Sequence, residues 1–556
     1  MNPENNPSTS VSNHASSLRV GWTVLILVTL FVCYFSHLGA LGFVGPDEPR
    51  YAWIARDMAE SGDWITPRLY GKPWFEKPVL YYWGAAASFK LFGVSEAAAR
   101  LPSAISALLA TLALAWLAWR LYGPETARWF LLLLPTTAAM IGFSHAASTD
   151  MPFSAMLTIA MVCAAEVIGL TRPYNSPAIP RTRWLALALL GFFLGLAVLA
   201  KGPAAIILSG GAIFFWALFT RRWRDAFRCL HPLAIATFCF TALPWYILCS
   251  RRNPDFFHVF IVEHNFRRFL TPEFQHIQPF WYYAPVLLDA ILPWTALFVW
   301  ALARGISRLW QAQRISESTC FLVCWAAFCV GFFSISRSKL PGYILPAIPA
   351  VSLIVAHAQT QITSPRQEKF LRLSLWIAAA AFLMPLLLSG LISGLDPGVF
   401  HQYQNLVVAA GIFSALVGMS NVLLATFYSS SQNGVGRFAA ASCVLPILLA
   451  VVTWNHFLPL FFRSDPSGRS LANDLYSAGI PPQRLRVGGI NRGLNYSLNF
   501  YMREEIKAWD KDHPVEGYLL TGTHDCRQWV SQPFVCQPVP FPNTEGRFLY
   551  KVLPGR

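Results

Sequence analysis

Long apolar stretches constrain this chain more than any other feature. A transmembrane helix needs about 20 predominantly apolar residues, and thirteen such stretches follow one another, separated by short polar or basic turns. In lipid a helix satisfies its own backbone groups, so each stretch is predicted to be a membrane-spanning helix. The first is too long for the apolar core of a signal peptide, so we expect it to be retained. The predicted spans are residues 19–38, 97–119, 126–142, 149–170, 184–200, 203–220, 230–249, 283–303, 319–335, 343–360, 371–392, 405–427 and 437–458.

The charge balance agrees with a multi-spanning membrane protein. Only 13% of the 556 residues are charged, whereas soluble domains average about 25%, which argues against an ordinary cytosolic enzyme. The 43 Lys and Arg residues exceed the 28 Asp and Glu residues and give a formal net charge of +15. A nucleic-acid-binding protein would gather its cations on one exposed patch and would not need 55% hydrophobic residues. We therefore expect no nucleic-acid partner.

The basic residues also predict the orientation. Loops after even-numbered spans hold clusters such as Arg221, Arg222, Arg224 and Arg228, and short loops rich in Lys and Arg stay in the cytoplasm. With thirteen spans, the N-terminus lies inside and the C-terminal segment outside. Two long loops, 39–96 and 250–282, then lie on the outer face. Within the first, residues 50–61 have the apolar spacing of an amphipathic helix on the membrane surface.

The two ends of the chain differ from its middle. Residues 1–18 are rich in Asn and Ser and predict a disordered cytoplasmic tail. Residues 19–460 make up the transmembrane domain, and residues 461–556 mix helical and strand-like patterns, so a small α/β domain is predicted outside. Cys526 and Cys536 lie in that domain. An oxidising compartment permits a disulfide between them, although the sequence alone does not fix the pairing.

Charged residues on the predicted outer face are candidates for binding and catalysis. Two carboxylates, Asp47 and Asp150, lie at span ends, where helix capping is the alternative reading for Asp150. The positive-inside rule disfavours cations in outer loops, so each cation found there needs an explanation. One explanation is that the side chain snorkels to lipid head groups. Cations from several loops that converge instead favour an anionic ligand such as phosphate. These cations are Lys77, Lys201, Arg267, Arg268, Arg337 and Lys339.

A metal site is a weaker candidate. Glu76 and His264 lie in the two long outer loops, and His with a carboxylate is an acceptable pair for zinc. Their spacing matches no metal motif, and a His hydrogen-bonded to a carboxylate is the favoured alternative. A nucleotide site is not indicated, because the chain has no GxxxxGK[ST] loop. Chemistry at the outer face would then need an activated substrate, and the activated donors of a membrane are lipid-linked.

Several motifs follow one another over residues 40–350. They are Asp47-Glu48-Pro49-Arg50-Tyr51-Ala52, Ser61-Gly62-Asp63-Trp64, Phe75-Glu76-Lys77-Pro78, Ala200-Lys201-Gly202, Glu263-His264, Pro279-Phe280-Trp281-Tyr282-Tyr283 and Ser338-Lys339-Leu340-Pro341-Gly342-Tyr343-Ile344-Leu345-Pro346. Together these motifs resemble those of the bacterial 4-amino-4-deoxy-L-arabinose:lipid A transferases. These are GT-C glycosyltransferases, with oligosaccharyl- and protein-O-mannosyltransferases as distant relatives.

The resemblance implies a monomeric, thirteen-span enzyme of the bacterial inner membrane whose active site faces the periplasm. It would move aminoarabinose from undecaprenyl phosphate to a lipid A phosphate with inversion at the anomeric carbon. This modification would make the cell resistant to polymyxin and other cationic peptides. Asp47 is similar to the family's key carboxylate, with Asp150 a second, and Glu76 and His264 correspond to a zinc pair. The residues similar to phosphate-handling groups are Arg50, Tyr51, Lys77, Lys201, Arg267 or Arg268, Lys339 and Tyr343.

Two other functions are compatible with parts of the sequence. A protein or polysaccharide glycosyltransferase of the same fold, using a polyprenyl-phosphate sugar, would keep Asp47 and a single phosphate site. A transporter would place charges at the bilayer midplane and show inverted repeats. The unusual charges lie at one face and no repeat is visible, so the transporter is disfavoured.

Overall fold

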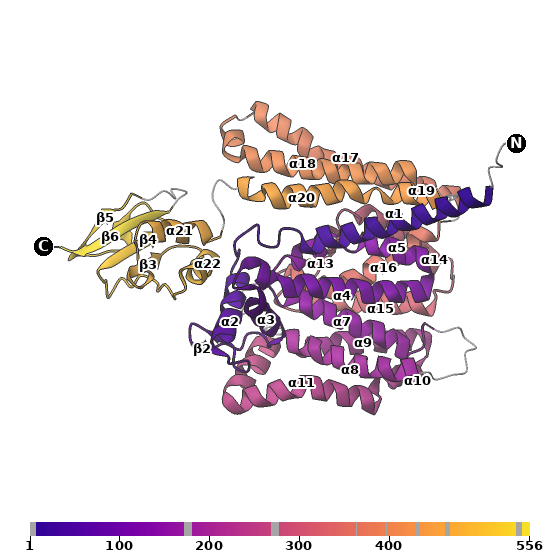
Figure 1. The fold of residues 1–556 in the computed structure, drawn as a ribbon, viewed down its shortest axis with the longest axis horizontal. Coiled ribbons are helices and arrows are strands. Elements are labelled where there is room, and N and C mark those ends of the chain that lie inside the picture. Colours follow the sequence, from indigo (N-terminus) through magenta and orange to yellow (C-terminus); the bar gives the residue numbers. More distant parts are fainter. Residues whose placement is uncertain are drawn as a thin grey trace.

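A computed structural model describes residues 7–171, 181–267, 277–362, 364–395, 397–428, 434–461, 467–540 and 547–555. Helices form a long bundle, and a small domain with a β-sheet lies beyond one end of it (Figure 1). Apolar side chains from most of the bundle helices make one continuous core. The bundle helices are α1 (Pro7–Phe35), α4 (Glu96–Tyr122), α5 (Pro124–Leu133), α6 (Ala138–Ser144), α7 (Asp150–Val167), α8 (Arg181–Lys201), α9 (Ala204–Thr220), α11 (Pro232–Arg252), α13 (Tyr283–Ala290), α14 (Thr295–Trp310), α15 (Glu317–Ile335), α16 (Ile348–Thr360), α17 (Pro365–Leu395), α18 (Pro397–Phe427), α19 (Gly434–Ala441) and α20 (Val444–Phe461).

Every predicted apolar stretch is largely helical, and the chain has the fold of a multi-spanning helical membrane protein. Nine helices of the described residues are long and apolar enough to cross a membrane, or ten if the bent pair α5 and α6 is one span. Length and composition therefore support nine or ten spans within the described residues, and the count of thirteen spans stays a prediction. Helix α9, with 17 residues, is one of the elements too short to be counted.

Proline explains where predicted continuous spans are broken. The stretch 126–142 splits into α5 and α6, which meet at 62°, and Pro135 lies in the break. The stretch 283–303 splits into α13 and α14 around Pro293, and 437–458 splits into α19 and α20 just before Pro446. Proline lacks a backbone N–H and its ring clashes with the preceding turn, so it interrupts a helix.

The predicted disordered tail over residues 1–18 is wrong for residues 7–18. These residues belong to α1, which begins at Pro7. The physical reason is cooperativity: extending an existing helix by a residue avoids the unfavourable nucleation step, so polar residues ahead of an apolar span are drawn into its helix. Residues 1–6 lie outside the described part of the chain.

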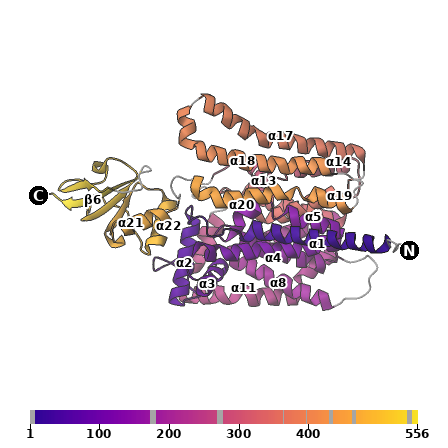
Figure 2. The same cartoon turned by 45° about the horizontal axis from the view of Figure 1, so that its top comes forward.

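The predicted outer loops gather at one end of the bundle. Helices α2 (Asp47–Ser61) and α3 (Leu80–Phe92) and the short strands β1 (Arg68–Leu69) and β2 (Lys72–Pro73) fill this end. The N-terminus and the short helix α10 (Trp223–Phe227) lie at the opposite end (Figure 1), and a second view agrees for the N-terminus (Figure 2). Segments predicted to lie on opposite sides of the membrane therefore lie at opposite ends of the molecule.

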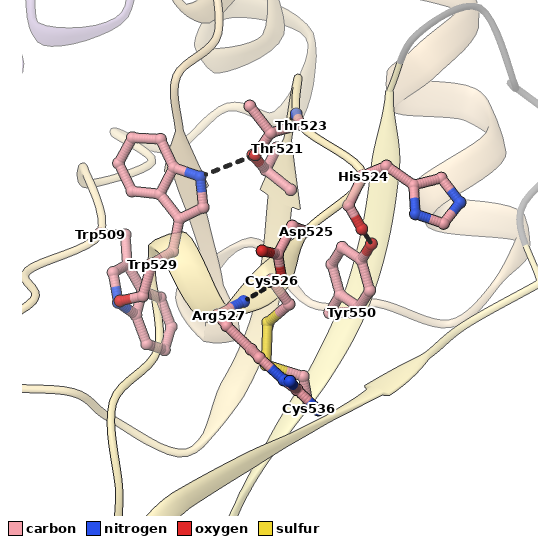
Figure 3. Close-up of a disulfide and its surroundings, with 10 residues drawn as sticks. All are labelled: Trp509, Thr521, Thr523, His524, Asp525, Cys526, Arg527, Trp529, Cys536 and Tyr550. Carbon is pink, nitrogen blue, oxygen red and sulfur yellow. Dashed lines mark hydrogen bonds between the residues drawn. A yellow bond between two sulfur atoms is a disulfide. The ribbon is translucent and has the colours of Figure 1, made fainter.

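The C-terminal domain contains a four-stranded mixed sheet. Its helices are α21 (Arg469–Ser477) and α22 (Arg492–Met502), and its strands are β3 (Leu485–Gly488), β4 (Gly517–Thr521), β5 (Phe534–Pro538) and β6 (Phe548–Pro554). The strand order is β3-β4-β6-β5, with β3 and β4 parallel and the other pairs antiparallel. A disulfide joins Cys526, in the 3-10 turn η5 (Cys526–Gln528), to Cys536 in β5 (Figure 3).

Helix α22 docks this domain onto the first outer loop. Ser497 Oγ donates to the carbonyl of Phe43 at 2.8 Å, and Arg56 Nη1 donates to the carbonyl of Phe500 at 2.9 Å. The hydroxyl of Tyr501 donates to Glu96 Oε1 at 2.7 Å. Helix α2 therefore packs against both α3 and α22. The prediction of a helix at residues 50–61 is confirmed. Its buried face packs against protein, and its position on the membrane surface stays a prediction.

Candidate active site

Arg50 holds two carboxylates at the start of α2. Its Nη1 donates to Glu76 Oε2 at 2.9 Å, its Nη2 donates to Asp47 Oδ1, and its Nε donates to the carbonyl of Pro46 at 2.8 Å. The Arg50 side chain is only 5% exposed, whereas that of Asp47 is 50% exposed. The guanidinium is thus committed to orienting Asp47 and Glu76, and Asp47 stays accessible to a ligand.

Aromatic rings surround the Arg50 guanidinium. Its Cζ lies 5.5 Å from the ring centroid of Trp74 and 5.3 Å from that of Tyr496 in α22. Burial works against its charge, but Glu76, Tyr51 and Asp47 more than offset this and raise the pKa of Arg50. Arg50 therefore remains a cation, held by two carboxylates and by aromatic faces.

The neighbouring carboxylate of Glu48 has a structural role. Arg100 donates to it from Nε at 3.0 Å and from Nη2 at 2.9 Å, and the backbone N–H groups of Val44 and Ala147 complete its bonding at 3.0 and 2.8 Å. Arg100 in turn donates to the carbonyls of Leu38, Leu41 and Gly42. The sequence analysis missed Arg100, because no local pattern signals a partner 52 residues away.

A second ion pair lies where three other segments of the chain meet. Asp150 begins α7 and Lys201 ends α8, and Lys201 Nζ donates to Asp150 Oδ1. The same ammonium lies 4.7 Å from the ring centroid of Tyr343, in the 3-10 turn η3 (Pro341–Ala347). Gly342 permits this approach, because a Cβ there would lie 2.8 Å from Phe143 and 3.3 Å from Asp150 Cγ.

Lys339 precedes that turn and is 6% exposed. Its Nζ donates to the carbonyls of Ser336 at 2.6 Å and Gln278 at 3.0 Å. A lysine ammonium has three N–H donors, so two are used within the described residues and the third can bind a ligand. Burial lowers the pKa of Lys339, and the nearby charge of Arg337 lowers it further.

Glu48 links the two groups of charges. It follows Asp47, and its Oε1 accepts from the N–H of Ala147, three residues before Asp150. The start of α2 and the turn before α7 are therefore joined by a direct hydrogen bond. The structure brings Asp47, Arg50 and Glu76 together, brings Asp150, Lys201 and Tyr343 together, and ties the segments that carry them to each other.

The remaining candidates are placed less fully. Lys77 follows Glu76 and is half-buried, and Arg267 is exposed at the end of the π-helix η2 (His258–Arg267). Arg268 and the side chain of His264 lie outside the described residues. Their predicted roles in binding phosphate and metal stay predictions.

Tyr51 does not fit a role in contacting phosphate. It is 2% exposed, and its ring centroid lies 6.1 Å from that of Tyr81 and 5.8 Å from that of Tyr82. Burial raises the pKa of its hydroxyl well above the usual value. Tyr51 was predicted to be in the site as part of the family motif at residues 47–52, but its ring packs against Tyr81 and Tyr82.

The described residues do not fit a zinc site. No group of three or more His, Cys, Asp and Glu side chains that could hold a metal occurs within the described ranges. The Glu76 carboxylate already pairs with Arg50, and a second cation there would be repelled by the guanidinium. We therefore derive no catalytic step through a metal.

A cavity of about 440 Å³ opens beside the Arg50–Glu76 pair. It lies between the segment after β2 and the segment that joins α11 to η2. Arg252 at its edge also donates to Asp63 Oδ1 at 3.2 Å. The cavity is lined by Pro73, Trp74, Phe75, Glu76, Arg252, Asn253, Pro254, Asp255 and Val259.

Comparisons with known proteins identify the family of this chain. The sequence model of the family "Dolichyl-phosphate-mannose-protein mannosyltransferase" matches residues 20–260. The chain is 30% identical over 436 residues to the undecaprenyl phosphate-alpha-4-amino-4-deoxy-L-arabinose arabinosyl transferase of Aeromonas salmonicida (strain A449), covering 77% of this chain and 75% of the relative. The protein of the same name from Serratia proteamaculans (strain 568) is 30% identical over 545 residues, covering 93% and 92%. The chain belongs to this family of arabinosyl transferases. The predicted resemblance is thus confirmed.

A solved structure shows the same fold. The crystal structure of ArnT from Cupriavidus metallidurans bound to undecaprenyl phosphate aligns with a TM-score of 0.76 at 24% identity, and the alignment covers 95% of this chain and 98% of that one. The chain therefore shares the multi-spanning helical fold of that structure.

Proposed function

We propose that this chain is an inverting glycosyltransferase that moves 4-amino-4-deoxy-L-arabinose from undecaprenyl phosphate to a phosphate of lipid A. The relatives are named for an arabinosyl transfer from undecaprenyl phosphate. The transfer takes place at the outer face of the bacterial inner membrane, and the product carries less negative charge. Cells with this activity resist polymyxin and other cationic peptides, as the family resemblance implies.

The observation that carries the proposal is the collection of cations and carboxylates at one end of the bundle. Both the donor's leaving group and the proposed acceptor are phosphates, so two anions must approach each other. Lys201 and Lys339, with Lys77 and Arg267 or Arg268, offset that repulsion. Groups fixed in advance by hydrogen bonds, as Lys201 and Lys339 are, stabilise developing charge without reorganisation.

The reaction is a single displacement at the anomeric carbon. An oxygen of the acceptor phosphate forms a bond to that carbon, and the bond from the carbon to the oxygen of undecaprenyl phosphate breaks. The leaving phosphate takes the electron pair, and configuration is inverted. Because the attacking phosphate is already an anion, no side chain needs to remove a proton. Asp47, half-exposed and held by Arg50, contacts the ammonium group of the sugar.

The proposal includes a topology of thirteen spans, with the N-terminus inside and the C-terminal domain outside. Three of the spans are helices broken at proline. The Cys526–Cys536 disulfide supports the outside position, because disulfides persist in oxidising compartments such as the periplasm. The proposal also includes a monomeric enzyme.

Mass spectrometry of lipid A tests the function directly. Lipid A from cells that express this chain should carry one added pentosamine on a phosphate, and lipid A from cells without it should not. The Asp47→Ala variant, produced at the same level, should give unmodified lipid A. Unmodified lipid A with an altered set of glycosylated proteins or polysaccharides would contradict the proposal and favour the other acceptor class.

A further inference from the structure

Tyr496 of the C-terminal domain lies between two guanidinium groups. Its ring centroid is 5.3 Å from Cζ of Arg50 and 5.4 Å from Cζ of Arg492. Its hydroxyl also lies 3.4 Å from Nε and 3.3 Å from Nη2 of Arg492, as an acceptor. The ring faces of tyrosine attract cations. One side chain of α22 therefore connects the Arg50 cluster with a second arginine.

The charges of these two arginines are balanced differently. Two carboxylates, Asp47 and Glu76, neutralise Arg50. Arg492 is exposed and contacts Tyr496, and within the described ranges it has no ion pair with a carboxylate. It also begins α22, where the helix dipole disfavours a cation. The charge of Arg492 therefore destabilises the start of α22, and no carboxylate within the described residues neutralises it.

Close backbone packing fixes where Arg492 lies. A Cβ on Gly493 would be 2.9 Å from the carbonyl carbon and 3.1 Å from Cα of Gly45. Gly45 is two residues before Asp47. The first turn of α22 thus lies directly on the loop that leads into the catalytic carboxylate. A ligand that reaches Asp47 would also come near the guanidinium of Arg492.

We propose that Arg492 is a binding residue for a phosphate of the lipid acceptor and that Tyr496 is the positioning residue that holds both Arg492 and Arg50. This inference rests on the proposed function, because it names the part of that site that receives the acceptor. An exposed guanidinium binds phosphate oxygens bidentately. The phosphate supplies the counter-charge that Arg492 lacks.

The position of α22 selects the acceptor over the donor. The polyprenyl chain of the donor must lie among the membrane-spanning helices, so its phosphate enters from the bundle. Helix α22 lies beyond the end of the bundle (Figure 1), where the large sugar head group of a lipid A molecule would project from the membrane. A cation carried by this domain meets that head group first.

Equilibrium binding tests the inference without turnover. The full-length protein in detergent is titrated with lipid A that carries two phosphates, in the absence of donor. We expect Arg492→Gln to raise the Kd about tenfold, as for loss of one charge-assisted hydrogen bond. Arg492→Lys should restore part of the affinity, because the charge remains. The matched control is Arg527→Gln, an exposed arginine beside the disulfide of the same domain (Figure 3).

Further measurements separate the possible outcomes. Fully dephosphorylated lipid A should bind wild type and Arg492→Gln equally. In turnover, Arg492→Gln should raise the acceptor KM and leave the donor KM unchanged, whereas Tyr496→Leu should lower kcat through Arg50, and Tyr496→Phe should keep kcat.

An unchanged Kd in Arg492→Gln, or an equal change in Arg527→Gln, would overturn the inference even if transfer occurs. A raised Kd together with no transfer to lipid A by wild type would instead contradict the proposed function and leave the phosphate site standing.

Discussion

Adjacent carboxylates have different tasks at the start of α2. Asp47 is half-exposed and held by Arg50, whereas Glu48 is 14% exposed and accepts from Arg100 and two backbone N–H groups. We expect Asp47→Asn to lower kcat about a hundredfold or more. The same substitution should change the free energy of unfolding by less than about 1 kcal/mol. Glu48→Gln should destabilise the fold by about 3 kcal/mol, because it leaves a buried arginine without its counter-charge. Measurements of turnover and thermal unfolding on both variants test this. Equal losses of stability would contradict a catalytic role for Asp47 and a structural role for Glu48.

The buried ammonium of Lys339 gives a pH dependence. Its pKa is lowered by burial and by Arg337, so as pH rises it loses its proton earlier than an exposed lysine would. The neutral amine binds phosphate weakly, so the donor KM should rise with pH from a lower pH than ordinary lysine titration predicts. Lys339→Arg stays charged and should move that rise to higher pH, and Lys339→Ala should raise the donor KM about tenfold at neutral pH. Donor KM measured between about pH 7 and pH 10 checks this, and superimposable wild-type and arginine profiles would refute it.

At the residue scale, the sequence predicted what is local or what breaks a topological rule. Asp47 and Arg50 are three residues apart in one helix turn, and Lys201 and Lys339 were identified because outer loops disfavour cations. The pairing of Glu48 with Arg100 and the contact of Tyr496 with Arg50 join residues far apart in the chain. Such contacts depend on how the domain docks, which no local pattern encodes.

For single helices too, local features were predicted from the sequence and long-range packing was not. Hydropathy located the long bundle helices but not α3, since burying about 20 apolar residues in lipid outweighs other preferences. It did not locate the breaks at Pro135, Pro293 and Pro446, although proline is a local signal that would have found them. The amphipathic pattern of α2 predicted its buried face, but such a pattern does not say whether lipid or a protein helix such as α22 covers that face.

The contact between α22 and the first loop depends on Gly493. A methyl group there would overlap the backbone of Gly45, so Gly493→Ala should push α22 away and separate Tyr496 from Arg50. We expect turnover to fall at least tenfold, as for loss of a positioned charged group, and the C-terminal domain to become more sensitive to limited proteolysis. Gly210→Ala is the control, because a Cβ on Gly210 meets no atom within 4 Å. Equal turnover in the two variants would show that docking does not position Arg50.

Across the whole molecule, two populations of cations lie at opposite ends. We expect those near α10 to orient the chain in the membrane, whereas those near α2, the end of α8 and η3 lie around the candidate site. The sequence separated the two populations by their loops alone. What it could not give is the place of the C-terminal domain, which closes over the first loop through α22 and so belongs to the same functional end.

This polarity predicts the redox state of the cysteines. The chain has 11 cysteines, of which Cys526 and Cys536 form a disulfide and nine are free. If the C-terminal domain lies outside, oxidation there keeps the disulfide, while the other thiols are in or beside the bundle. Protein purified without reductant and then denatured should therefore titrate nine thiols, rising to 11 after reduction. A variant with both Cys526→Ser and Cys536→Ser should titrate nine in either case. A titration of 11 thiols without reduction would mean that this domain faces the cytoplasm, and the orientation of the whole bundle would be reversed.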